Sequence, residues 1–199
     1  MTRFAGLLAL AAALVTARFA PAQDDKPKYY RIVSLDTGEA LDVTDASTED
    51  GAKIVVNAKS DADSQQWKMV KTGDYVKFIN KKSGKLLDVP GFTKDEGAEI
   101  IQWEDNGGEN QQWTVDKPAK DKSDKGVFIK SRSSELVLDV AGESKEDGAS
   151  VIQWGYHGGK NQLWELVEVK KKGAYLYASN SLPRIAVATF SFKISSVPS

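Results

Sequence analysis

The 199-residue sequence contains no cysteine, so no disulfide can stabilise the fold and no thiol can act as a nucleophile or a metal ligand. It contains a single histidine, His157, which excludes a histidine cluster of the kind that binds zinc. The sequence also has no excess of either charge, because 27 basic and 28 acidic residues give a net charge of −1. Surfaces that bind nucleic acid are usually basic. Stability must therefore come from a packed apolar core, and we expect no cofactor, no metal and no nucleic-acid partner.

The sequence also lacks a hydrophobic run long enough to span a bilayer, which takes about 20 residues. The shorter run Phe4–Val15 follows Arg3 and precedes the small-residue pattern Ala20-Pro21-Ala22. This order is typical of a secretory signal peptide and its cleavage site. We therefore expect residues 1–22 to be a signal peptide, residues 23–28 to be a linker, and the mature chain to be secreted or otherwise extracytoplasmic.

Three copies of one sequence unit fill most of the remaining chain. Each copy contains a Leu-Asp-Val motif, followed at constant distances by Gly-Ala and by Gln-x-Trp. These motifs begin at Leu41, Leu87 and Leu138, at Gly51, Gly97 and Gly148, and at Gln65, Gln111 and Gln162. We place the repeats at about 29–70, 75–116 and 127–168, with the polar segment Asp116–Lys125 as a loop between the second and the third.

Each unit contains short β-branched and aromatic runs separated by glycine, aspartate and asparagine, a pattern typical of strands joined by tight turns. In the second unit the predicted strands are Tyr75–Ile79, Leu86–Val89, Glu99–Trp103 and Gln111–Val115. No stretch shows a sustained helical period. Three units of four strands are too few for a typical β-propeller, so the sequence favours an all-β fold, a β-trefoil, whose closed barrel leaves no exposed strand edge.

The triple motif resembles the ricin B-chain type of lectin domain, a β-trefoil carbohydrate-binding module. The resemblance covers about Tyr29 to Val169. It implies a non-catalytic lectin rather than an enzyme, with a shallow sugar pocket on each repeat. Many family members carry a cysteine directly before the Asp-Val pair, where this sequence has leucine, so the family's disulfide is absent.

The resemblance assigns the sugar contacts to the aspartate of Leu-Asp-Val, to an aromatic residue in the third run, and to the asparagine before Gln-x-Trp. A carboxylate accepts hydrogen bonds from hydroxyls, a ring covers an apolar sugar face, and an amide fixes orientation. In the second and third repeats these residues, with a glutamine that braces the loop, are Asp88, Trp103, Asn110 and Gln111, and Asp139, Trp154, Asn161 and Gln162. The first repeat keeps Asp42 but has Asn57 and Ser64 in place of the ring and the amide, so we expect its pocket to be degenerate.

The five tryptophans divide into two classes. Trp67, Trp113 and Trp164 occur in every repeat and are predicted to be core residues. Trp103 and Trp154 are predicted to face solvent, because the first repeat tolerates asparagine at the same position and asparagine is a poor replacement for a buried ring.

The polar candidates have structural alternatives. Strand alternation points the aspartates away from the core, where they serve either a ligand or the adjacent turn. Asn110 and Asn161 are equally consistent with turn residues. His157 is either solvated or part of the rim of the third pocket. Gln102 and Gln153, one position before each ring, are predicted to face away from the ligand.

Residues 170–199 lie beyond the repeats, and the apolar segment Ala174–Ser199 has no assigned purpose. This tail and the loop Asp116–Lys125 support an alternative hypothesis, a β-trefoil protein-interaction module such as a protease inhibitor or a scaffold. In that case the contact surface would be the tail or the loop, and not the exposed tryptophans.

Overall fold

The computed structural model describes residues 27–118 and 126–170, in which the chain forms twelve strands and six single-turn 3-10 helices. The strands are β1 (Tyr30–Ser34), β2 (Ala40–Val43), β3 (Ile54–Asn57), β4 (Trp67–Thr72), β5 (Tyr75–Asn80), β6 (Leu86–Asp88), β7 (Ile101–Trp103), β8 (Trp113–Asp116), β9 (Phe128–Ser131), β10 (Val137–Val140), β11 (Ala149–Trp154) and β12 (Trp164–Glu168). The 3-10 helices are η1 (Thr44–Ala46), η2 (Asp63–Gln65), η3 (Pro90–Phe92), η4 (Glu109–Gln111), η5 (Ala141–Glu143) and η6 (Lys160–Gln162). The predicted signal peptide, most of the loop Asp116–Lys125 and nearly all of the tail lie outside the described residues.

Six strands, two from each repeat, form a barrel. Strand β4 pairs with β1 and β5, β5 also pairs with β8, β8 pairs with β9, and β1 pairs with β12. A single bridge between Val127 and Trp164 joins the start of β9 to β12 and completes the ring. Closure removes the free strand edges that would otherwise invite pairing with another chain.

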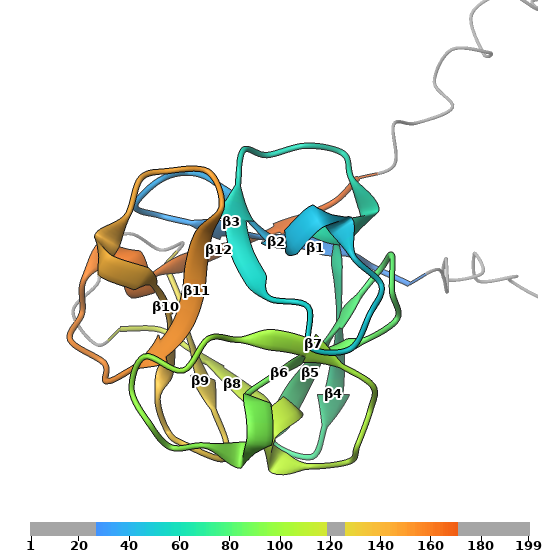
Figure 1. Ribbon diagram of the computed structural model, residues 1–199, viewed down its shortest axis with the longest axis vertical. Coiled ribbons are helices and arrows are strands. Elements are labelled where there is room, and N and C mark those ends of the chain that lie inside the picture. Colours follow the sequence, from blue (N-terminus) through green and yellow to red (C-terminus); the bar gives the residue numbers. More distant parts are fainter. Residues whose placement is uncertain (1–26, 119–125, 171–199) are drawn as a thin grey trace, which may run out of the picture.

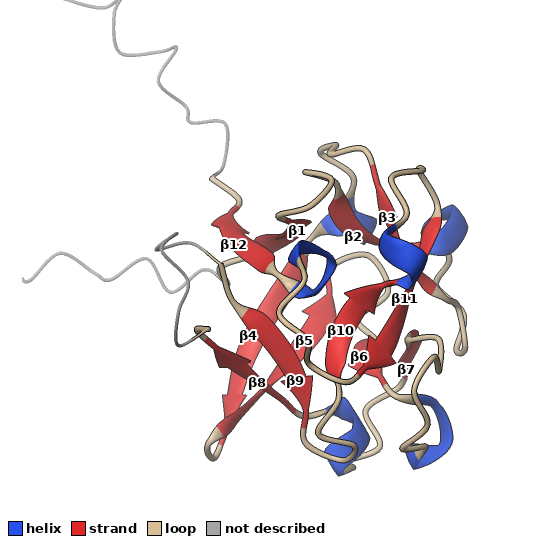
Figure 2. Ribbon diagram, turned by 90° about the vertical axis from the view of Figure 1, so that its left-hand side faces the viewer, coloured by secondary structure: helices blue, strands red, loops and turns tan. Residues whose placement is uncertain are grey.

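Three hairpins, β2–β3, β6–β7 and β10–β11, lie at one end of the barrel, one from each repeat (Figures 1 and 2). Their second strands meet one another: β3 pairs with β11, and single bridges join Lys53 to Ile101 and Glu99 to Ile152. A barrel of three repeats capped by three hairpins is the β-trefoil that the sequence predicts. None of the 3-10 helices in the described ranges is long or apolar enough to cross a membrane.

The core is built from equivalent residues of the three repeats. Trp67, Trp113 and Trp164 are fully buried, which confirms their predicted role. Each indole N–H donates a hydrogen bond of 3.1 to 3.2 Å to the carbonyl of the leucine in its own Leu-Asp-Val motif. The same cluster contains Ile32, Val43, Ile54, Phe78, Val89, Ile100, Ile129, Val140 and Val151. Each repeat therefore anchors its second and fourth strands to each other through one tryptophan.

Candidate functional site

In the second and third repeats, the aspartate of the Leu-Asp-Val motif and the predicted pocket tryptophan lie on the same face of a hairpin. In the second repeat, β6 and β7 pair so that Leu86 lies opposite Trp103. Asp88 follows Leu86 by two residues and therefore shares its face of the hairpin with Trp103. The hairpin β10–β11 has the same register, which places Asp139 beside Trp154 in the same way.

Helix η4 brings two amides onto the Asp88 carboxylate. The Oδ2 atom of Asp88 accepts hydrogen bonds from Asn110 Nδ2 at 3.0 Å and from Gln111 Nε2 at 2.8 Å. Gln111 also donates to the carbonyl of Glu104 at 2.7 Å and accepts from the backbone N–H of Asn106 at 3.0 Å, so it ties the loop to the carboxylate. Asp88 points away from the core, on the hairpin face that carries Trp103, as strand alternation predicts, but it is nevertheless buried. The two amides cover it from the side that alternation leaves open.

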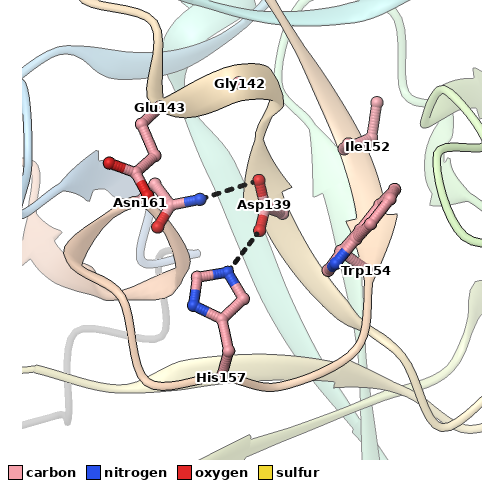
Figure 3. A pocket seen from close by; sticks show the side chains of 7 residues that line it. All are labelled: Asp139, Gly142, Glu143, Ile152, Trp154, His157 and Asn161. Carbon is pink, nitrogen blue, oxygen red and sulfur yellow. Dashed lines mark hydrogen bonds and ion pairs between the residues drawn. The ribbon is translucent and has the colours of Figure 1, made fainter.

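The third repeat repeats this arrangement and adds an imidazole (Figure 3). Asp139 accepts hydrogen bonds from Asn161 Nδ2 at 2.9 Å and from Gln162 Nε2 at 2.8 Å. His157 Nε2 lies 3.5 Å from Asp139 Oδ2. The Nδ1 atom of His157 accepts the backbone N–H of Gly159 at 3.2 Å, so a neutral imidazole carries its proton on Nε2, toward the carboxylate.

A cavity of about 250 Å³ opens above Asp139. It is lined by Asp139, Gly142, Glu143, Ile152, Trp154, His157 and Asn161. Figure 3 shows Trp154 on one side of Asp139 and Glu143 on the other. Asn161 Oδ1 is buried and accepts no hydrogen bond within the described ranges, and the equivalent Asn110 Oδ1 is in the same state.

The two pocket tryptophans face solvent, as predicted. Trp103 and Trp154 remain 42% and 40% exposed, although both are large apolar side chains. Each ring rests against a glycine of the neighbouring repeat: a Cβ on Gly51 would lie 3.6 Å from Trp103 Cζ3, and Gly97 has the same relation to Trp154. Each ring is thus supported from below and open above.

In the first repeat the carboxylate is satisfied by the protein itself. Asp42 Oδ1 accepts the backbone N–H of Val43 at 2.8 Å, and Oδ2 accepts Asn57 Nδ2 at 3.1 Å and Gln65 Nε2 at 3.0 Å. Asn57 occupies the position of the exposed tryptophans, and Ser64 that of the pocket asparagines. This repeat therefore has a braced carboxylate but no ring above it.

Burial changes the acidity of the pocket carboxylates. Burial raises the pKa of Asp88 to about 6, against the lowering effect of the hydrogen bonds from Gln111 and Asn110. The pKa of Asp139 is also raised by burial, although hydrogen bonds from Gln162 and Asn161 oppose the shift. Within residues 27–118 and 126–170, no group of three histidine or acidic side chains is arranged to hold a metal ion.

Gln102 and Gln153 face the interior and have a structural role. Both are fully buried. The Nε2 atom of Gln102 donates to the carbonyls of Ser47 and Glu49 in the first repeat, each at 3.0 Å. Gln153 makes the equivalent pair of bonds to the second repeat. These side chains join adjacent repeats and lie on the opposite strand face from the pocket rings.

The predicted set of site residues omits Phe92 and Glu143. Both stand four residues after the aspartate of the preceding motif, where η3 and η5 end, and both have positive φ. Glu143 forms a wall of the third cavity, and Phe92, which is 51% exposed, holds the equivalent place in the second repeat. The sequence does contain one sign of Phe92, because an apolar ring directly after Gly91 is unusual in a turn that is otherwise polar.

A family model described as ricin-type β-trefoil lectin domain-like matches residues 18–103 and 109–188 of the chain. Among curated proteins, the clotting factor G alpha subunit of Tachypleus tridentatus is 43% identical over 53 residues. This stretch is 26% of the present chain and 8% of that protein, so the likeness covers only a small part of the relative.

Two solved structures combine a similar fold with substantial sequence identity. A designed threefold-symmetric protein, ThreeFoil, is 42% identical with a TM-score of 0.67, covering 71% of this chain and 99% of that one. An exo-β-1,3-galactanase from Clostridium thermocellum is 39% identical with a TM-score of 0.67, covering 73% of this chain and 31% of that one. The present chain thus corresponds to nearly all of a threefold-symmetric protein and to about a third of a larger enzyme.

Proposed function

The chain belongs to the ricin-type β-trefoil lectin-like family, and on this premise we propose that it is a secreted, non-catalytic carbohydrate-binding protein with working pockets in its second and third repeats only. The carboxylates of Asp88 and Asp139 would accept sugar hydroxyls, while Trp103 and Trp154 would cover an apolar sugar face. Asn110 and Asn161 would orient the ligand. His157 would contribute from the rim of the third pocket.

One observation carries the proposal: an exposed ring, a braced carboxylate and a buried amide occur together in the second and third repeats and not in the first. Large exposed aromatic rings are costly, and each shares a hairpin face with a carboxylate, Trp103 with Asp88 and Trp154 with Asp139. Gln111 and Gln162 are fully buried, so we assign them to holding the carboxylate rather than to touching sugar. In the first repeat the ring is missing and Asn57 takes a hydrogen-bonding position on Asp42.

Shallow pockets of this kind bind monosaccharides weakly, and a millimolar dissociation constant is only about 4 kcal/mol. Two such pockets on one rigid body would gain avidity on a polysaccharide or a glycan-coated surface if both can engage at once. The expected partner is therefore a polymeric or clustered carbohydrate. The exo-β-1,3-galactanase likeness suggests galactose and β-1,3-linked galactobiose as the first ligands to test.

Isothermal titration calorimetry with these two sugars tests the proposal. The wild-type protein is expected to bind two monosaccharides, Trp103→Ala and Trp154→Ala one each, and the double variant none. Asn57→Ala, at the same position in the first repeat, is the matched control and is expected to leave the stoichiometry at two. Unchanged binding by a folded double variant would refute the assignment.

A further inference from the structure

The two proposed pockets share their aspartate, tryptophan and asparagine but differ at two wall positions. Where the third pocket has Glu143, the second has Phe92, and where the third has His157, the second has Asn106. Glu143 and Phe92 both follow a glycine in the left-handed conformation, and both have positive φ themselves, at 53° and 57°. Since Ala46 has the same conformation in the first repeat, the turn imposes this backbone and leaves the side chain free to vary.

The third pocket is anionic. Its lining contains two carboxylates, Asp139 and Glu143, an exposed indole ring and an imidazole, but no lysine or arginine. Glu143 and Trp154 stand on opposite sides of Asp139 (Figure 3). An aromatic face and a carboxylate both attract a cation, the former through its ring quadrupole.

The second pocket has an aromatic wall in place of the second carboxylate. Phe92 is exposed, and its ring tip reaches the opposite loop: a Cβ on Gly108 would lie 2.6 Å from Phe92 Cζ. Gly108 is two residues before Asn110, so the Phe92 ring lies on the asparagine side of the pocket and Trp103 on the strand side. A bulky residue with positive φ is unusual, and about half of the Phe92 surface remains exposed.

We propose that the residue after the turn glycine sets the ligand class of each pocket, so that the third pocket selects sugars that carry a protonated amine and the second selects neutral sugars. The inference rests on the proposed carbohydrate-binding function and concerns only which sugars each pocket prefers. Glu143 and Phe92 are the specificity-determining residues. The protein would then hold a hexosamine and a neutral hexose at the same time, as on a polymer that contains both.

The size of the effect follows from exposure and screening. A cavity of about 250 Å³ holds little more than one monosaccharide, so an amine on the sugar ring stays within about 8 to 10 Å of both carboxylates, the screening length in moderate salt. Because Glu143 is exposed, its ion pair with an amine should strengthen binding only about two- to fivefold. The preference should shrink at about 1 M salt, where the screening length is about 3 Å.

Each pocket is measured alone by disabling the other: Trp103→Ala reports the third pocket and Trp154→Ala the second. Calorimetric titrations at about pH 7 compare galactosamine with galactose and with N-acetylgalactosamine, which has no charge. In the Trp103→Ala background, galactosamine is expected to bind about two- to fivefold more tightly than either neutral sugar, and Glu143→Gln is expected to reduce this ratio to about one. In the Trp154→Ala background, galactosamine is expected to have no advantage, and Phe92→Glu is expected to create one.

The outcomes separate the inference from the proposed function. If neither background binds any of the three sugars, the proposed function itself fails. If both backgrounds bind galactose but galactosamine has no salt-sensitive advantage at the third pocket, only the inference is overturned. An advantage that survives Glu143→Gln would also overturn it, because the amine would then be recognised by other groups.

Discussion

A buried carboxylate such as Asp88 weakens a fold unless donors surround it. Two amide N–H groups bind its Oδ2 atom, and burial still raises its pKa to about 6. The difference between this pKa and the ordinary value of about 4 for aspartate corresponds to about 3 kcal/mol between the protonated and ionised forms. Because the pKa of Asp88 is higher in the folded protein than in the unfolded chain, the protonated carboxyl stabilises the fold relative to the ionised one. This stabilisation is fully present below about pH 4 and is lost as the pH rises through about 6.

Asp88→Asn is therefore expected to stabilise the protein at neutral pH while abolishing sugar binding by the second pocket. The amide oxygen of the variant can still accept from Asn110 and Gln111, and no charge remains buried. The free energy of unfolding should exceed that of the wild type by about 1 to 3 kcal/mol at pH 7 and should match it below about pH 4.

Urea denaturation of both proteins at the two pH values measures this difference. Asp74→Asn, which removes an exposed carboxylate in the turn between β4 and β5, is a control for a general change in net charge. A variant that is less stable than the wild type at pH 7 would show that the carboxylate contributes more through its hydrogen bonds than its burial costs.

At the scale of the elements, the 3-10 turns η4 and η6 place the pocket amides, and a glycine precedes each. A Cβ on Gly159 would overlap Asn161 Oδ1 and lie 2.5 Å from His157 Cε1. Gly108 stands in the same relation to Asn110. In the first repeat both positions differ together, with Ala62 and the shorter Ser64. The pocket asparagine therefore requires glycine two residues before it, because any larger residue would overlap its side chain.

Gly159→Ala is expected to abolish binding by the third pocket, because the added methyl displaces Asn161 from Asp139. Binding by the second pocket should be unchanged, and stability should fall by about 1 to 3 kcal/mol, the usual cost of overpacking. Calorimetry in the Trp103→Ala background, where only the third pocket reports, measures the loss.

Ala62→Gly, the reverse change in the first repeat, is the matched control and should leave both pockets intact. If Gly159→Ala retains normal affinity in a folded protein, then Asn161 is a turn residue with no part in binding. Of the two roles that the sequence leaves open for the asparagines, ligand binding or formation of the turn, that outcome would favour the turn.

The strands and the turns differ in how far the sequence predicts them. Repetition and alternation locate the strands of the second repeat to within about two residues, because side-chain burial has a period of two. The turn η4 is not predicted, and Gln111 lies in it rather than in a strand, because a single helical turn has no period to detect. The burial of Asp88 and the wall position of Phe92 follow from that turn and its counterpart η3, so they also required the structure.

For the whole molecule, the threefold symmetry extends to the contacts between repeats. An acidic side chain in one repeat accepts the backbone N–H directly after the ring position of the next: Asp50 from Glu104 at 2.8 Å, and Glu96 from Gly155 at 3.0 Å. Asp147 closes the circle with Ala58 at 2.6 Å. The backbone beneath the missing ring of the first repeat is therefore held as it is in the other two.

The first pocket can accordingly be restored. A Cβ on Gly148 would meet nothing within 4 Å, whereas the equivalent Gly51 and Gly97 each support a tryptophan ring. The triple variant Asn57→Trp, Ser64→Asn and Ala62→Gly supplies the ring, the amide and the space that the amide needs, and it releases Asp42 from the asparagine that now bonds to it.

We expect calorimetric titration of this variant with galactose to give three sites in place of two, with little change in stability because the new ring lies on preformed backbone. Asn57→Trp alone, without the amide, is the control and should bind at the first repeat much more weakly. If the triple variant folds and still binds two sugars, the ring, carboxylate and asparagine are not sufficient for a pocket. The ligand would then depend on the wall position, where the first repeat has only Ala46, and this would assign to Phe92 and Glu143 a part in affinity as well as in selectivity.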